Sequence, residues 1–197
     1  FDMYHKILDD AVKELKENEF KSLFEKELSQ YAETVAQDCT IETDMEILFP
    51  EDYIDNISER LRLYSELDNI DTEDDLHNFS QMLRDRFGPI PDQVYALIDT
   101  VRLRWKAQEL GFEKLLLKNE GLKGYFVPSD NQEFYQSDKF GHILAYVQKN
   151  PQRFRVKESK KRLILSVQDI TSVGDAMHIL DAILQHVTPE QSIVENN

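Results

Sequence analysis

The spacing of hydrophobic residues changes near residue 112, and this change limits the folds that the chain can adopt. Between residues 57 and 110, apolar side chains recur every three or four positions, as they do along one face of an α-helix. Phe112 to Lys118 and Leu122 to Val127 are instead short apolar runs that flank Asn119-Glu120-Gly121, a pattern typical of a β-hairpin. Consecutive helices followed by hairpins favour an α+β domain over a doubly wound parallel sheet.

Three helices are predicted before this hairpin. Thr72 followed by Asp75 predicts a helix start near residue 73, because both side chains can bind amides of a first turn. Gly88 and the prolines after it end that helix. The next helix is expected from about Asp92 to Gly111. The earliest helix follows a turn at residues 50–54 and presents one apolar face, made of Ile57, Leu61, Tyr64 and Leu67.

The C-terminal third repeats a helix, a hairpin and a helix. Ser137 can cap a helix that stops at Pro151, and Ser172 with Asp175 can cap the last helix. Between them, residues 153–157 and 162–167 are predicted to form a second hairpin. We therefore expect an α+β fold in which three N-terminal helices precede two hairpin-plus-helix units, with helices packed on an antiparallel sheet.

The N-terminal segment differs from the rest in charge. Residues 1–49 hold 13 Asp and Glu against 5 Lys and Arg, and their apolar residues keep a helical period as far as Val35. Ile41, Thr43, Met45 and Ile47 then alternate with acids, as in a half-buried strand. We predict a helical arm over 1–46, a domain over 47–190 and a frayed tail over 191–197. The chain begins within a periodic pattern and without Met, which indicates a piece of a longer protein.

Composition and motifs argue against several functions. The net charge of -15 argues against broad nucleic-acid binding, which needs clustered Lys and Arg. We find no phosphate-binding loop, no dinucleotide fingerprint and no histidines at metal-ligand spacing, so we expect no cofactor, no metal and no catalysis in this chain. A single cysteine, Cys39, and the absence of a long apolar stretch favour a reducing cytoplasm and no membrane.

Two charged stretches are candidate binding sites. Residues 66–75 contain six acids and no Lys or Arg, which suits either a solvated loop that favours the next helix N-terminus or an acidic rim for a basic partner. The second stretch, residues 149–162, is basic and includes Phe154. It could hold single-stranded nucleic acid through Arg153, Arg155, Lys157, Lys160 and Lys161. Alternatively, Arg153, Arg155 and Lys157 alternate as the outer face of an ordinary strand would.

Several segments resemble the C-terminal domain of bacterial transcription-repair coupling factors. The similarity covers roughly residues 47–187 and is densest over 48–112. It is carried by Leu48 to Ile54, Arg60 to Tyr64, Asp85 to Asp92, Val101 to Arg104 and Ala107 to Phe112. Residues 1–15 also look like the segment that leaves the motor region in this family.

This resemblance implies a regulatory role without catalysis. The parent would be an ATP-driven translocase on double-stranded DNA that acts on stalled RNA polymerase in transcription-coupled DNA repair, with ATP and Mg²⁺ bound by motor domains outside this chain. The terminal domain would clamp an N-terminal repair module and hide its site for the damage-recognition ATPase of nucleotide excision repair. Engagement of polymerase and DNA would release this autoinhibition.

The helix predicted to begin near residue 73 offers a surface for such a clamp. Its apolar stripe of Leu76, Phe79, Leu83 and Phe87 leaves Asp74, Asn78, Gln81 and Asp85 on the opposite face. We predict that Asp85 binds an arginine of the partner module, with Asp74 adding longer-range attraction. Asp85 could instead pair locally with Arg84, with Arg86 or with a residue across the following turn. Met82 stands where some members of the family carry an acid, which is expected to make the contact less charged.

Overall fold

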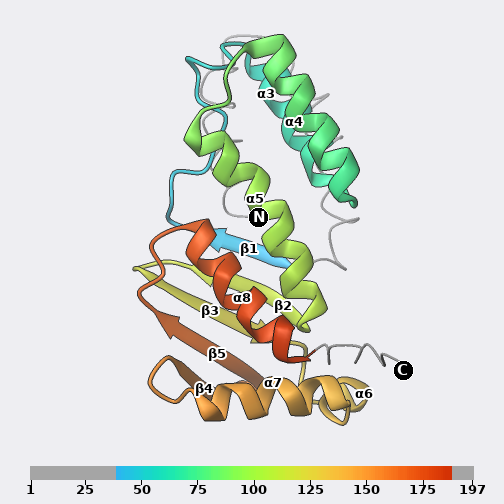
Figure 1. Cartoon of the computed structure of the whole chain (residues 1–197), viewed down its shortest axis with the longest axis vertical. Helices are drawn as coiled ribbons and strands as arrows, with labels where there is room; N and C mark the ends of the chain where they lie inside the picture. The colour runs from blue at the N-terminus through green and yellow to red at the C-terminus, as the bar shows by residue number, and fades with distance from the viewer. Residues whose placement is uncertain (1–38, 188–197) are drawn as a thin grey trace, which may run out of the picture.

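The computed structural model describes residues 39–187, which form a five-stranded sheet and six helices (Figure 1). The predicted α+β fold is confirmed, and the order of helices and hairpins from residue 57 onward matches except for one short helix at Gln132–Tyr135 that was not predicted. The elements are β1 (Thr40–Thr43), α3 (Ile57–Asp68), α4 (Glu73–Phe87), α5 (Asp92–Glu109), β2 (Phe112–Leu117), β3 (Gly121–Phe126), α6 (Gln132–Tyr135), α7 (Asp138–Lys149), β4 (Phe154–Ser159), β5 (Arg162–Gln168) and α8 (Val173–Val187).

The sheet has the order β1-β2-β3-β5-β4 and is antiparallel except at one edge, where β1 runs parallel to β2. A wholly antiparallel sheet was expected. The three helices between β1 and β2 form a crossover long enough for parallel pairing, which a hairpin cannot provide.

The predicted arm over residues 1–46 overlaps the sheet. β1 lies inside this range, so the sheet begins before residue 47. The rest of that arm up to residue 38, and the tail at 191–197, lie outside the described residues.

β1 is shorter than the alternating pattern over residues 41–47 suggested. The Met45 amide donates a hydrogen bond to the Thr43 hydroxyl, and the Ile47 amide donates to the Met45 carbonyl. The Asp44 amide still donates to the Leu117 carbonyl of β2, and the two local bonds follow as the chain leaves the sheet. Ile47 is still buried, but in the core under the helices and not in the sheet.

Both hairpins close through two-residue turns. The central residues of the turns have φ of 54° and 53° at Asn119 and Glu120, and of 50° and 62° at Lys160 and Lys161. Positive φ at both positions is the requirement of the turn whose twist matches that of antiparallel strands. Both predicted hairpins are therefore confirmed, and the second turn presents two lysines at its tip.

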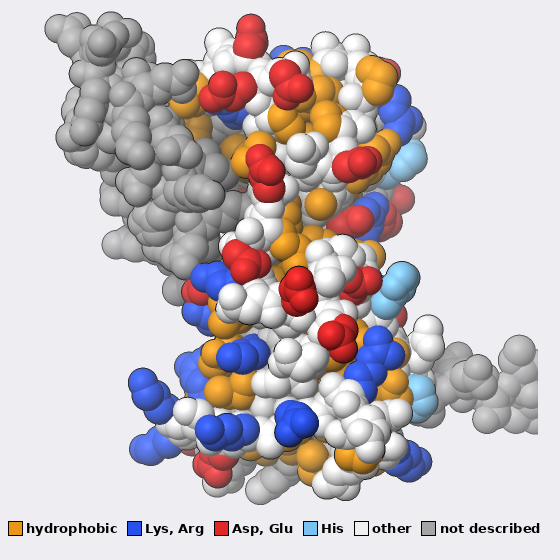
Figure 2. All heavy atoms as spheres, turned by 90° about the vertical axis from the view of Figure 1, so that its left-hand side faces the viewer, with side chains coloured by type: hydrophobic (Ala, Val, Ile, Leu, Met, Phe, Trp, Pro, Cys, Tyr) orange, Lys and Arg blue, Asp and Glu red, His pale blue; other side chains and the backbone are white. Residues whose placement is uncertain are grey.

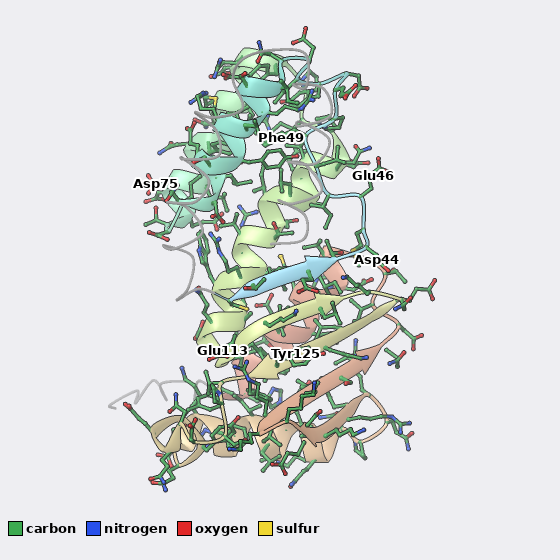
Figure 3. The ribbon with its side chains drawn as sticks, turned by 180° about the vertical axis from the view of Figure 1, so that it is seen from behind. Asp44, Glu46, Phe49, Asp75, Glu113 and Tyr125 are labelled. Atoms are coloured by element: carbon green, nitrogen blue, oxygen red, sulfur yellow. The ribbon has the colours of Figure 1, made fainter. Side chains whose placement is uncertain are left out.

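The helices form two groups that meet at α5. In the first group, α5, α7 and α8 cover one face of the sheet (Figure 1). In the second group, α3 and α4 form a helical hairpin that lies beyond the sheet, against the first half of α5. Seen from behind, the strands lie in front of α5 and α8 (Figure 3). The opposite face of the sheet is therefore not covered by any helix among residues 39–187.

The segment before α3 is held by two buried polar contacts. The Phe49 amide donates a hydrogen bond of 2.7 Å to the Tyr64 hydroxyl, and the two rings lie 4.8 Å apart. Arg60 is 8% exposed and donates to the backbone carbonyls of Ile54 and Asp55. These contacts explain why this segment and α3 form a single unit, since each buried polar group has a partner.

Burial raises the pKa of Tyr64 to about 12, although the hydrogen bond from the Phe49 amide opposes this shift. The pKa in the unfolded chain is about 10. The neutral phenol therefore contributes its full stability below pH 10, and this contribution is lost as the pH rises from 10 towards 12. We expect the wild-type chain to lose roughly 2 to 3 kcal/mol more stability over this interval than Tyr64→Phe.

Urea unfolding followed by circular dichroism between pH 8 and pH 11.5 measures this difference. Tyr64→Phe removes the acceptor of a buried amide and is expected to cost about 1 to 3 kcal/mol at pH 8. The other tyrosines titrate in both proteins and cancel in the comparison. Parallel stability curves for the two proteins would contradict the assignment.

Candidate interdomain contact surface

The outer face of α4 is a polar surface on a well-anchored helix. Leu76, Phe79 and Leu83 are buried on its inner side, as the periodicity predicted. The N-terminus is capped by Thr72, whose hydroxyl accepts a bond from the Asp75 amide and donates to its carboxylate. The four predicted contact residues are exposed on the opposite side and extend over about three turns: Asp74, Asn78, Gln81 and Asp85.

The arginines beside Asp85 are held by other groups. Arg84 donates a hydrogen bond of 3.2 Å to the Tyr95 hydroxyl on α5. Arg86 forms an ion pair of 2.7 Å with Glu59 of α3 and lies over the Phe87 ring. The hydrogen bond from Arg62, and to a smaller extent the one from Arg86, holds the pKa of Glu59 below its usual value.

Asp85 itself forms no hydrogen bond or ion pair with any residue between 39 and 187. The local pairing with Arg84 or Arg86 that the sequence allowed is absent from this part of the chain, because these side chains turn towards α5 and α3. Asp85 is exposed, and its carboxylate is available to a partner. Its role in a contact stays a prediction.

The acidic stretch of residues 66–75 is largely paired within the domain. Asp75 serves the α4 cap, and it lies at the outer edge of the helical hairpin in Figure 3. A hydrogen bond from Arg102 lowers the pKa of Glu73. Three acids form ion pairs with arginines of α3 and α5, namely Glu66 with Arg62, Asp68 with Arg104, and Glu73 with Arg102. Of the six acids in this stretch, Asp71 and Asp74 are exposed and form none of these contacts, so they are the two that could contribute to an acidic rim for a partner.

Tyr53 is a supporting residue that the sequence did not single out. Its hydroxyl donates to the carbonyls of Leu83 and Gly88, and its ring lies 5.9 Å from Phe87. Gly88 has a φ of 87°, which suits glycine and ends α4. Tyr53 thus fixes the C-terminal turn of α4, next to Asp85. Its partners are 30 and 35 residues away, so no local pattern could have identified it.

The basic residues of the second hairpin form a separate surface. Arg153, Arg155 and Lys157 lie at the β4 edge, and Lys160 and Lys161 form the turn; all five are exposed. β4 and the C-terminal end of α4 lie at opposite ends of the molecule (Figure 1). Figure 2 shows acidic side chains gathered over the helical end and basic ones over the sheet end. The two predicted sets of residues therefore do not form one site.

Between residues 39 and 187, no three His, Cys, Asp or Glu side chains come together as metal ligands. One small crevice between α7 and the sheet is lined by apolar side chains, among them Phe126, Ile143 and Leu165. Within the same part of the chain, no helix has the length and apolar character needed to cross a membrane.

Asp85→Arg is expected to leave stability unchanged within about 0.5 kcal/mol, because the exposed carboxylate has no partner among the described residues. Asp68→Ala serves as the contrast, since it removes the partner of a mostly buried arginine, Arg104. This second change is expected to cost about 1 to 2 kcal/mol. Thermal and urea unfolding of the two variants test the difference, and an equal loss in both would show that Asp85 has a structural role.

Comparisons with known proteins agree with the fold. The model of the TRCF domain family matches residues 43–137. Transcription-repair-coupling factors of Escherichia coli and Haemophilus influenzae are 32% identical over 158 residues and 30% identical over 155 residues; each alignment covers 79% of this chain. The relative from Staphylococcus epidermidis strain RP62A is 25% identical over 188 residues, 92% of the chain.

The chain spans only 12% to 15% of the length of these relatives. A solved structure of a C-terminal domain of transcription-repair coupling factor superposes with a TM-score of 0.57 at 16% sequence identity. The superposition covers 77% of this chain and 96% of that one, which shows that the two share a fold.

Proposed function

Because this chain belongs to the TRCF domain family, we propose that it is a non-catalytic regulatory domain of a longer transcription-repair coupling factor. The domain clamps an N-terminal repair module of the same protein. In the clamped state it masks the site at which that module binds the damage-recognition ATPase of excision repair. ATP hydrolysis, Mg²⁺ binding, translocation on double-stranded DNA and contact with RNA polymerase belong to other domains of the cytoplasmic parent protein.

The observation that supports this proposal is the unpartnered carboxylate of Asp85 on a helix whose opposite face is locked into the core. A hydrated carboxylate on a rigid helix is prepared to receive an arginine, and such charge-assisted, often bidentate bonds are the strong ones. Asn78 and Gln81 add neutral donors and acceptors along the same face. Met82, half-buried beside them, lowers the charge of the contact.

A clamp of this kind needs only a weak interface. When two modules are joined in one chain, the effective concentration of one at the other is in the millimolar range. A dissociation constant near 10 µM would then keep about 99% of the molecules closed. Release requires only that the parent's engagement with polymerase and DNA favour the open state by a few kcal/mol.

Binding of the 197-residue chain to the separately expressed N-terminal module tests the clamp. We expect micromolar binding that weakens with salt, and a loss of about tenfold or more in Asp85→Arg, equivalent to ~1.4 kcal/mol. Asp130→Arg is the matched control, because it makes the same charge change at an exposed site in the loop before α6. Titration calorimetry at two salt concentrations gives the affinities.

Two results would refute the clamp as described. Absence of wild-type binding at millimolar concentration would remove the interface, whereas an equal loss in Asp85→Arg and Asp130→Arg would move it away from α4. In the full-length parent, Asp85→Arg is further expected to increase binding of the damage-recognition ATPase without polymerase. An unchanged affinity there would separate the α4 contact from masking.

A further inference from the structure

The face of the sheet that no helix of the described residues covers, here called the open face, carries a defined set of side chains. The strand register places outward-pointing residues from four strands in two rows across the sheet. Tyr125 lies near the middle of this face, and Figure 3 shows it from the open side. The rows are Lys114, Tyr125, Ile164 and Lys157, and next to them Leu116, Lys123, Ser166 and Arg155.

Positive charge on this face is only partly neutralised. Lys114 pairs with Glu42, and Arg162 pairs with Glu113 at the end of the sheet. Lys123, Arg155 and Lys157 are exposed and have no carboxylate partner among residues 39–187. The lysines at the β4–β5 turn extend this basic area. In a chain with a net charge of -15, an uncompensated basic surface is a local feature that attracts anions.

The cations surround an apolar and aromatic centre. Tyr125 is partly exposed, and its direct neighbours on this face include Ile164 on β5 and, one row away, Leu116 on β2. Lys123 is two residues from Tyr125 on the same strand, and Arg155 and Lys157 lie on β4, two strands away, where each strand spacing is about 4.8 Å. A flat ring flanked by cations is the combination that holds a stacked base and its neighbouring phosphates.

We propose that the open face of this sheet binds a short stretch of single-stranded nucleic acid. One base stacks on Tyr125, and the adjoining phosphates bind Lys123, Arg155 and Lys157. A duplex fits this face poorly, because its bases are already stacked on one another and are not free to stack on Tyr125. The proposal is independent of the α4 clamp, since the two surfaces lie at opposite ends of the molecule (Figure 1).

Fluorescence anisotropy of a labelled twelve-nucleotide thymidine oligomer, with the 197-residue chain as titrant, measures this binding. If three phosphates are neutralised, the affinity is expected to fall roughly 20-fold between 50 and 200 mM salt. The corresponding uridine oligomer tells whether the sugar matters. Mixed-sequence duplex DNA is expected to bind at least about tenfold more weakly than the thymidine oligomer.

Single substitutions locate the site. Lys157→Glu is expected to weaken binding by at least about tenfold, whereas Lys149→Glu makes the same charge change at the end of α7 and should alter it less than about twofold. Tyr125→Leu keeps the face apolar and is expected to cost about fivefold or more through lost stacking. Unchanged circular dichroism melts confirm that the variants fold.

Several outcomes would overturn the proposal. No binding of either oligomer at 50 mM salt removes it outright. An equal effect of Lys149→Glu and Lys157→Glu means that attraction is not confined to this face. Tighter binding of duplex DNA, or no loss in Tyr125→Leu, rules out stacking of a single strand. Displacement of the oligomer by polyglutamate at equal charge concentration assigns the surface to an acidic protein.

Discussion

The architecture depends on the two-sided burial of α5. This helix of 18 residues is about 27 Å long, and it packs on α3 in its first half and on α8 and β2 in its second. Leu103 and Ala107 are completely buried. Three basic residues at alternate positions of α5 form ion pairs with acids of three other helices. These pairs are Arg102 with Glu73 of α4, Arg104 with Asp68 of α3, and Lys106 with Asp181 of α8. α5 therefore joins the helical hairpin to the sheet as one body.

These ion pairs also decide which charges remain at the surface. By pairing with the arginines of α5, two acids of the stretch between α3 and α4 become part of the structure. Asp85 lies in the last turn of α4, at the opposite end of that helix from the acids that pair with α5, and its own neighbours are bound to α3 and α5. The Asp85 carboxylate, which is proposed to form the clamp, therefore has no partner among the described residues, whereas Glu66, Asp68 and Glu73 are held in ion pairs.

The two ends of the molecule consequently present opposite chemistry. Acidic side chains gather over the helical end and basic ones over the sheet end (Figure 2). A rigid α5 between them holds the α4 surface and the open sheet face at a fixed separation. A partner protein on the first and a nucleic-acid strand on the second could therefore bind the same domain without competing for residues.

The sequence by itself determined most of the features that depend on near neighbours. The cap at Thr72, the glycine stop at Gly88, both hairpins and the exposure of Asp85 follow from patterns within a few residues of chain. Only the tertiary structure decided the parallel pairing of β1, the pairing of the acidic stretch with α5, and the placement of Lys123 and Tyr125 of β3 on the same face as Lys157 of β4. These features depend on contacts between residues more than 25 positions apart, whose geometry is set by packing and leaves no local pattern.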